Sequence, residues 1–184
     1  MDDASRKVER VTGTEIGDTA PDFTLAGIRF QNGTVEHVDF SLAAARGKPL
    51  VLAFYPLDAS KVCTEQLCSY QDQLRGFEDL GAQVWGISLQ GVESHEDFAR
   101  AQGISFPLLA DTAGVSRDYG VMLGSLAVRR SVFILDGDGV IRWKHVAMLG
   151  LTYRSAEQIR EELRRLFPEP TASAQRFDLP PPPA

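Results

Sequence analysis

Two apolar segments flank a stretch of helical periodicity in the first half of the chain. Residues 49–55 and 82–89 are mostly apolar, which is typical of strands that are buried on both faces of a sheet. Between them, from about residue 63 to residue 80, apolar positions recur at the spacing of one helix face. We therefore predict a strand that ends at Pro56, then a helix, then a second strand.

Turn and cap signals divide the rest of the chain into similar elements. Asn32-Gly33 and the Gly-Asp-Gly segment 137–139 favour tight hairpins. Ser155 is typical of a helix N-cap, and Gly103 is typical of a helix end. Further strands are predicted after the turn-rich segment 17–23 and at 35–40, 106–110, 131–136 and 140–145, and further helices at 42–45, 94–101, 115–119 and from Ser155 to about residue 167.

The order of these elements predicts the fold class. Strands that alternate with helices indicate βαβ units with parallel strands, and the late hairpin adds antiparallel strands. We expect an α/β protein in which helices flank a mixed central sheet, as in the three-layer thioredoxin-like fold. One such domain is predicted over residues 16–167, after a polar lead-in at 1–15. The tail at 168–184 is rich in proline and is predicted to be disordered or extended.

Composition and charge exclude several classes of function. The 184 residues carry a formal net charge of −6, and the arginines of the last helix alternate with glutamates, so no nucleic-acid partner is expected. The N-terminus has no signal-peptide core, and no segment is apolar for long enough to cross a membrane. His37, His95 and His145 are scattered, so we expect no metal site. Two cysteines do not make a secreted disulfide scaffold, which favours the reducing cytoplasm.

Those two cysteines, Cys63 and Cys68, carry the candidate chemistry. Cys63 is expected in the first turn of the predicted helix, where unpaired N–H groups and the helix dipole favour an anion such as a thiolate. On an intact helix, Cα atoms five residues apart are separated by roughly 8–9 Å. A disulfide tolerates at most ~7 Å. If these cysteines bond to each other, the first helical turn has to unwind.

Several motifs in the expected order resemble those of the peroxiredoxins, and most of all the bacterioferritin-comigratory (Prx Q) group. The family pattern Pro-x-x-x-Thr/Ser-x-x-Cys is matched by Pro56, Ser60 and Cys63, and Cys68 matches the resolving position of that group. Further resemblance is found in segments 20–23, 86–88, 106–111 and 130–136.

The chain departs from the pattern at three places. Ser60 stands where the group often has Thr, and Lys61-Val62 stands where it often has Pro-Gly. The family usually has Glu three residues after the first cysteine, and this chain has Gln66, with Glu65 one residue earlier. The sequence alone therefore leaves open which of these two side chains supports the arginine of the site.

The resemblance implies reduction of hydrogen peroxide and organic hydroperoxides without a cofactor. Cys63 would be oxidised to a sulfenic acid, with Arg130 and Ser60 binding the peroxide oxygens and Pro56 shielding the sulfur. Cys68 would then form a disulfide with Cys63, which thioredoxin or a glutaredoxin-like dithiol would reduce. Arg130, and not Arg129, directly precedes the matching strand. The protein is expected to be a monomer or a homodimer.

Two other functions remain open from the residues. The same fold serves thiol–disulfide oxidoreductases, but these normally have Cys-x-x-Cys, and here four residues separate the cysteines. A non-enzymatic redox-responsive interaction module is the other alternative, in which unwinding of the helix would display a surface to a partner. Ser60 and Arg130 favour the enzyme, because a sensor does not need them.

Overall fold

A seven-stranded mixed sheet forms the centre of the molecule. The computed structural model describes residues 14–31, 33–147 and 152–168. The order of the strands in the sheet is β2 (Thr34–Ser41), β1 (Thr24–Gln31), β5 (Leu108–Ala110), β4 (Gln83–Ser88), β3 (Leu50–Phe54), β8 (Ser131–Leu135) and β9 (Ile141–Val146). β3, β4 and β5 are parallel to their neighbours within this group, and the outer strands are antiparallel. The predicted mixed sheet is confirmed.

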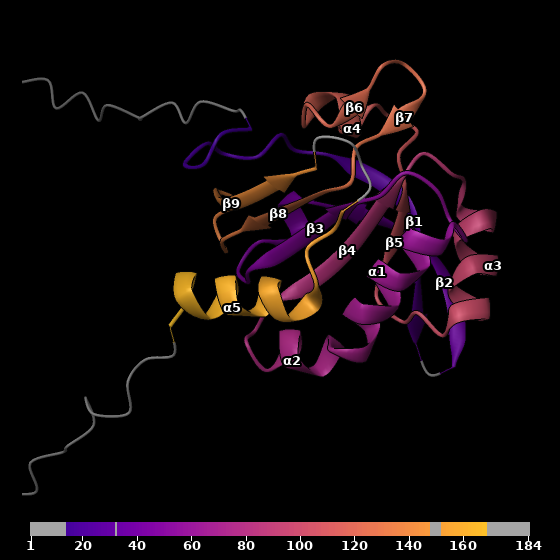
Figure 1. Ribbon diagram of the computed structural model, residues 1–184, viewed down its shortest axis with the longest axis horizontal. Helices are drawn as coiled ribbons and strands as arrows, with labels where there is room; N and C mark the ends of the chain where they lie inside the picture. Colours follow the sequence, from indigo (N-terminus) through magenta and orange to yellow (C-terminus); the bar gives the residue numbers. More distant parts are fainter. Residues whose placement is uncertain (1–13, 32, 148–151, 169–184) are drawn as a thin grey trace, which may run out of the picture.

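Helices cover both faces of the sheet and give three layers (Figure 1). One face carries α1 (Lys61–Asp72), α2 (Leu74–Glu78), α3 (Val92–Gln102) and α5 (Ala156–Leu166). The other face carries η1 (Ala43–Ala45) and α4 (Val115–Asp118). Each layer encloses its own apolar core, so the sheet is buried on both sides.

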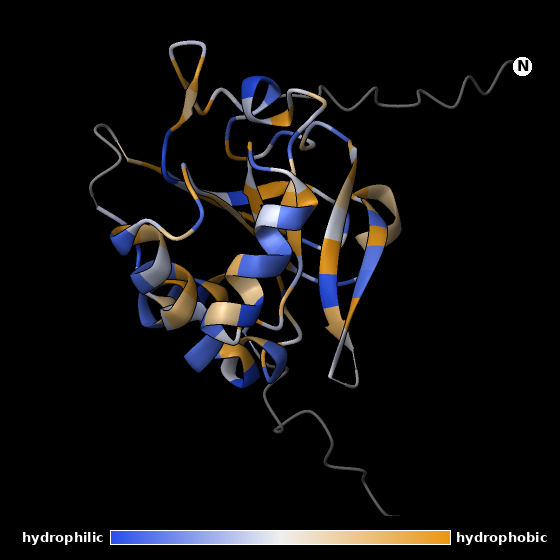
Figure 2. Cartoon of the chain, turned by 90° about the vertical axis from the view of Figure 1, so that its right-hand side faces the viewer, coloured by the Kyte–Doolittle hydropathy of each residue, from blue (hydrophilic) through white to orange (hydrophobic). Residues whose placement is uncertain are grey.

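β3 shows why an uninterrupted apolar segment becomes a central strand. All five of its residues are buried, and successive side chains point to opposite faces. Val51 and Ala53 pack with α1, α3 and α5, whereas Leu52 and Phe54 pack with the core under α4. Burying a side chain as large as valine, leucine or phenylalanine stabilises the fold by about 1.5–3 kcal/mol. By contrast, β2 at the sheet edge mixes apolar and charged residues, as the banding of the hairpin in Figure 2 shows.

The helix predicted up to about residue 80 is present but interrupted. It begins at Lys61, ends at Asp72, and continues as α2 after Gln73. The prediction that Ser94 opens the next helix was wrong. α3 begins at Val92 after Gly91, so Ser94 lies inside the first turn, where its hydroxyl donates to Asp58. Gly103 ends α3 with a φ of 67°, as its sequence position predicted.

The C-terminal half follows the predicted elements closely. β8 and β9 form the expected hairpin, and Ser155 caps α5 through a capping box with Gln158. The small hairpin of β6 (Met122–Leu123) and β7 (Ala127–Val128) was not predicted. Its two-residue strands are too short to leave a periodic pattern.

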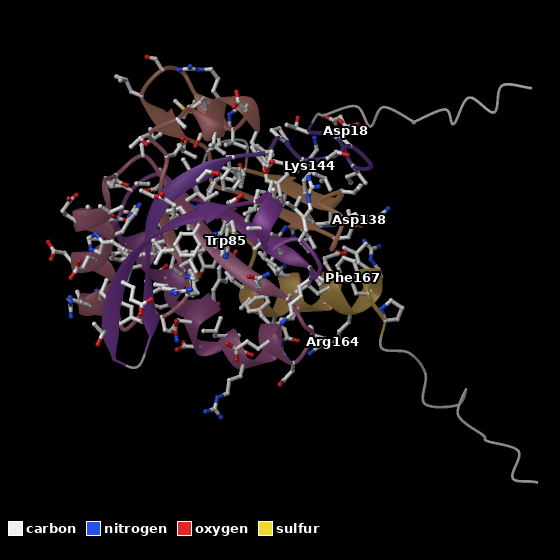
Figure 3. All side chains as sticks on the ribbon, turned by 180° about the vertical axis from the view of Figure 1, so that it is seen from behind. Asp18, Trp85, Asp138, Lys144, Arg164 and Phe167 are labelled. Carbon is white, nitrogen blue, oxygen red and sulfur yellow. The ribbon has the colours of Figure 1, made fainter. Side chains whose placement is uncertain are left out.

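The segment before β1 covers part of the outer edge of the sheet. Gly17 N donates to the Ile141 carbonyl at 2.8 Å, and Ile141 N donates to the Asp18 carbonyl at 2.9 Å. Lys144 Nζ reaches Glu15 Oε1 at 2.8 Å on the side of the molecule where Figure 3 labels Asp18 and Lys144. The rest of the polar lead-in and the proline-rich tail from residue 169 lie outside the described residues. Within the described part of the chain, no helix has the length and hydrophobicity to span a membrane.

Candidate active site

The pairing of β3 with β8 brings Cys63 and Arg130 together from positions 67 residues apart. Phe54 pairs with Ser131, so Arg130 leaves the sheet at the edge where β3 ends. The chain turns there through the loop 56–60 into α1, which carries Cys63 near its start. Arg130 Nη2 donates to Cys63 Sγ at 3.3 Å, and both residues are buried. The guanidinium therefore places positive charge directly against the sulfur.

A chain of hydrogen bonds holds that guanidinium in place. Arg130 Nη1 donates to Gln66 Oε1 at 2.7 Å, and Gln66 Nε2 donates to the Tyr70 hydroxyl at 3.1 Å. The Tyr70 hydroxyl donates in turn to the Arg154 carbonyl at 2.8 Å. Burial raises the pKa of Tyr70, although Gln66 and Arg130 oppose the shift, so the phenol stays a proton donor. Gln66, which is fully buried, contacts the arginine.

Glu65 points away from this chain of hydrogen bonds. Its side chain is exposed, whereas Gln66 lies one position further around the helix and faces the core. The question that the sequence left open is thus answered by the phase of α1. An amide in this position orients Arg130 through a hydrogen bond and adds no negative charge beside the cation.

The start of α1 is arranged to favour an anion. Ser60 is its N-cap residue, Cys63 is its third residue, and its first turn contains no acidic residue. The unpaired N–H groups of this turn and the dipole of the helix favour negative charge on the sulfur. The Ser60 side chain makes no capping hydrogen bond, so capping is not its role. Pro56 directly follows Tyr55 and is half-buried at the beginning of the same loop.

Both cysteines are free thiols on one continuous helix. Cys63 is buried, whereas Cys68 is partly exposed, with its Sγ 3.9 Å from Gln102 Oε1 of α3. Burial and the nearby Asp72 carboxylate raise the pKa of the Cys68 thiol, so that thiol stays protonated at neutral pH. The two sulfurs therefore have different environments, one cationic and enclosed, the other neutral and accessible.

Arg129 and Arg130 differ in how deeply their side chains are buried. Arg130 is 3% exposed and contacts Cys63, whereas Arg129 is half-buried and its carbonyl accepts from the Ser131 hydroxyl at 3.0 Å. The preference for Arg130 over Arg129, made from the position of the following strand, agrees with this geometry.

One part of the site was missed by the sequence analysis. Asp58 of the 56–60 loop accepts hydrogen bonds from Tyr55 and from two side chains of α3, Ser94 and His95. From the sequence, His95 was considered only as a possible metal ligand. Nothing in the local pattern joins residues 37 positions apart, so only the packing of α3 against the loop could have shown this network.

Comparison with known proteins agrees with this geometry. The sequence model of the AhpC/TSA family matches residues 16–144. The chain belongs to this family. Peroxiredoxin Q of the chloroplast in Sedum lineare is 38% identical over 130 residues, 68% of this chain and 66% of that protein. The rice (japonica) peroxiredoxin Q, also named chloroplastic, is 36% identical over 131 residues, 69% of this chain and 57% of that protein. The chain thus spans little over half the length of the rice protein.

Other peroxiredoxins share the fold. Mouse peroxiredoxin-2 is 35% identical over 137 residues, 70% of this chain and 67% of that protein. The crystal structure of Enterococcus faecalis AhpC superimposes with a TM-score of 0.74 at 27% identity, over 84% of this chain and 92% of that one. Mycobacterium bovis AhpC gives a TM-score of 0.77 at 24% identity, over 90% and 100% of the two chains. The resemblance to the peroxiredoxins, and the thioredoxin-like fold that it implied, are confirmed.

Proposed function

We propose that this peroxiredoxin is a thiol-dependent peroxidase that reduces hydrogen peroxide and organic hydroperoxides. The observation that carries the proposal is the contact of 3.3 Å between Arg130 Nη2 and Cys63 Sγ at the start of α1. A guanidinium and a helix N-terminus together stabilise a thiolate, which is the nucleophile in cysteine chemistry. Membership of the family and the names of the relatives point to the same activity.

In the first step, the Cys63 thiolate attacks one oxygen of the peroxide. The S–O bond forms as the O–O bond breaks, which leaves a sulfenic acid on Cys63 and releases water or an alcohol once the departing oxygen takes a proton. Negative charge develops on that oxygen, where N–H groups of Arg130 donate to it. The Ser60 hydroxyl binds the peroxide beside the sulfur, and Pro56 limits access of water.

In the second step, Cys68 reduces the sulfenic acid. Its sulfur attacks Cys63 Sγ, a disulfide forms, and the hydroxyl group leaves as water with the thiol proton. Because the cysteines lie five residues apart on α1, the helix has to open before the sulfurs meet. A dithiol protein such as thioredoxin or a glutaredoxin-like protein then restores both thiols by disulfide exchange.

The cellular location and the oligomeric state of the protein are part of the same proposal. We place the protein in the cytoplasm, where a reducing environment keeps thiols available. The word chloroplastic in the names of several relatives describes those plant proteins. A monomer or a homodimer is proposed as the working form.

Stopped-flow consumption of peroxide in the presence of a dithiol reductant tests the proposal. The unmodified protein is expected to turn over peroxide continuously, Cys63→Ser to consume none, and Cys68→Ser to be oxidised once at the normal rate. Mass spectrometry of non-reduced peptides after one equivalent of peroxide should then find the Cys63–Cys68 disulfide in the unmodified protein and a sulfenic acid in Cys68→Ser, which proceeds to a sulfinic acid with excess peroxide.

The other functions give different results in this assay. A thiol–disulfide oxidoreductase would reduce disulfide substrates and leave peroxide unconsumed. A redox-responsive interaction module would be oxidised by one equivalent of peroxide without further turnover. Equal loss of the first oxidation in both cysteine variants would contradict the assigned roles.

A further inference from the structure

A buried hydrogen-bond network ties the loop before Cys63 to helix α3. Asp58 Oδ1 accepts from the Tyr55 hydroxyl at 2.7 Å, and Asp58 Oδ2 accepts from the Ser94 hydroxyl at 2.7 Å. His95 Nδ1 lies 2.8 Å from Asp58 Oδ2, and His95 Nε2 lies 3.1 Å from the Leu109 carbonyl oxygen of β5. The His95 side chain is fully buried and that of Asp58 is 5% exposed. One carboxylate of the loop is thus bonded to Tyr55 and to α3, and His95 extends the network to β5.

The geometry of His95 requires an extra proton in this network. Nε2 faces a carbonyl oxygen, which only accepts, so Nε2 carries a proton. Nδ1 faces the Asp58 carboxyl, whose oxygens already accept from two hydroxyls. A neutral ring with a bare Nδ1 would set a lone pair against a carboxylate, so the pair holds a second proton between these atoms.

The charges around the pair place that proton on the ring. Burial alone would raise the pKa of Asp58, but the hydrogen bond and charge of His95 and the two hydroxyls hold it below its ordinary value. Burial raises the pKa of Tyr55 well above its ordinary value, so its phenol remains a donor to the carboxylate. Ser88 of β4 lowers the pKa of the Tyr55 phenol, and Cys63 of α1 raises it.

The same loop contains strained backbone. Ala59, between Asp58 and Ser60, has a φ of 55° and is the one residue other than glycine with a positive φ in the part of the chain that the structure describes. The left-handed conformation is unfavourable for a residue with a Cβ. Such a conformation persists only where surrounding contacts enforce it. Next to Ala59, the contacts of Asp58 supply that constraint.

We propose that Asp58 and the doubly protonated His95 form a clamp that holds the strained 56–60 loop and so positions Ser60 and Cys63 for attack on the peroxide. Both are positioning residues, since they act through the loop. The proposal rests on the proposed function only for its kinetic part, because the protonation of His95 and the order of the loop exist without turnover. Loss of the Asp58 contacts is expected to loosen the loop.

Two substitutions of Asp58 separate the hydrogen bonds from the charge. Asp58→Ala removes all three hydrogen bonds and is expected to slow oxidation of Cys63 by peroxide by about tenfold or more, since small displacements of reacting groups cost rates of this size. In Asp58→Asn, the amide can donate to the bare Nδ1 of a neutral ring and still accept from Tyr55. We expect this variant to keep most of the rate and most of the order of the loop.

Nuclear magnetic resonance of the reduced protein provides the readout that a merely structural role would not change. The nitrogen shifts of the His95 ring should show protons on both atoms at neutral pH in the unmodified protein and on one atom in Asp58→Asn. Hydrogen exchange at residues 59–64 should be faster in Asp58→Ala than in the unmodified protein, and close to that of the unmodified protein in Asp58→Asn. A ring with a single proton in the unmodified protein would overturn the proposal, whatever the peroxidase assay gives.

The chain offers a matched control on the same helix. Glu96, next to His95, pairs with His37 at 2.7 Å on the surface. Glu96→Gln removes that exposed ion pair and should leave both the oxidation rate and the loop exchange unchanged. If Asp58→Ala does not fold, Ser94→Ala, which removes one hydrogen bond to Asp58, takes its place with a smaller expected slowing. Equal rates in Ser94→Ala, Glu96→Gln and the unmodified protein would refute the positioning role.

Discussion

At the scale of single residues, the proposed chemistry depends on how one arginine is oriented. Arg130 donates to Cys63 through one nitrogen and to Gln66 through the other, so its plane is set by two partners in α1. Guanidinium geometry makes this possible, because its N–H groups form a rigid fork. Burial of all three side chains strengthens the interactions, since few water molecules compete.

Substitution of the two neighbouring arginines tests this orientation. Arg130→Ala removes the cation beside the sulfur, and we expect the rate constant for oxidation of Cys63 to fall by roughly 10²–10³-fold. Arg129→Ala, which leaves the contact with Cys63 in place, should change the rate by less than about twofold. A larger effect of Arg129→Ala would mean that the wrong arginine has been assigned.

At the scale of elements, the first turn of α1 has two tasks that conflict. In the proposed reaction, it has to be helical to present Cys63 to Arg130, and it has to open to let Cys68 reach Cys63. Opening costs a few hydrogen bonds, each worth about 0.5–1.5 kcal/mol net. At the start of α1, the Ser60 side chain makes no capping bond and Lys61 is exposed. Buried Leu67 and Tyr70 instead anchor its later part to the core.

Oxidation is therefore expected to unfold part of α1. Hydrogen exchange of amides 64–70 should be slow in the reduced protein and faster in the oxidised one, because a disulfide between residues 63 and 68 does not fit an intact helix. Amides of α5, which has a capping box at its start, serve as the internal control. Unchanged protection of 64–70 in protein whose disulfide has been verified by mass would contradict the expectation.

At the scale of the whole molecule, two carboxylates link stability to pH. Asp136 closes the β8–β9 turn, where it accepts from Val140 N at 2.9 Å and from Arg142 Nε at 2.6 Å. Burial would raise its pKa, but these bonds hold the pKa below the ordinary 3.8. The pKa of Asp58 is lowered in the same direction by its contacts with α3. Both carboxylates stabilise the fold in their charged form.

The sign of this linkage gives a prediction for Asp136→Asn. A carboxyl whose pKa is lowered by folding contributes stability above its ordinary value, and that contribution is lost as the pH falls through the lower folded value. We expect Asp136→Asn to reduce the free energy of unfolding by about 1 kcal/mol at neutral pH, since charge-assisted hydrogen bonds are lost. The difference from the unmodified protein should shrink below pH 3.8.

Denaturant unfolding at a series of pH values measures this difference. Asp97→Asn, at an exposed position of α3, is the control and should have little effect at any pH. A difference for Asp136→Asn that stays constant from neutral to acid pH would show that the carboxylate charge makes no contribution.

Local patterns in the sequence were enough to predict most of the elements. The apolar segment at 49–55 became β3, and the periodic segment after it became α1, because burial and side-chain period are properties of short stretches. The hairpin at 137–139 and the cap at Ser155 followed from residues with strong turn and cap preferences. The motif that joins Pro56, Ser60 and Cys63 is equally local, which is why the resemblance could name the two cysteines.

Only the tertiary structure decided which side chains meet in the site. The phase of α1 turned Gln66 and not Glu65 toward Arg130, and a difference of one residue in helix phase is beyond what a periodic pattern resolves. The packing of α3 on the 56–60 loop joined His95 to Asp58, and no short-range signal connects them. The two cysteines and Arg130 could be identified as candidate site residues from the sequence itself. Their supporting contacts depend on how distant elements pack, because hydrogen bonds between distant residues form only once the core sets their distance.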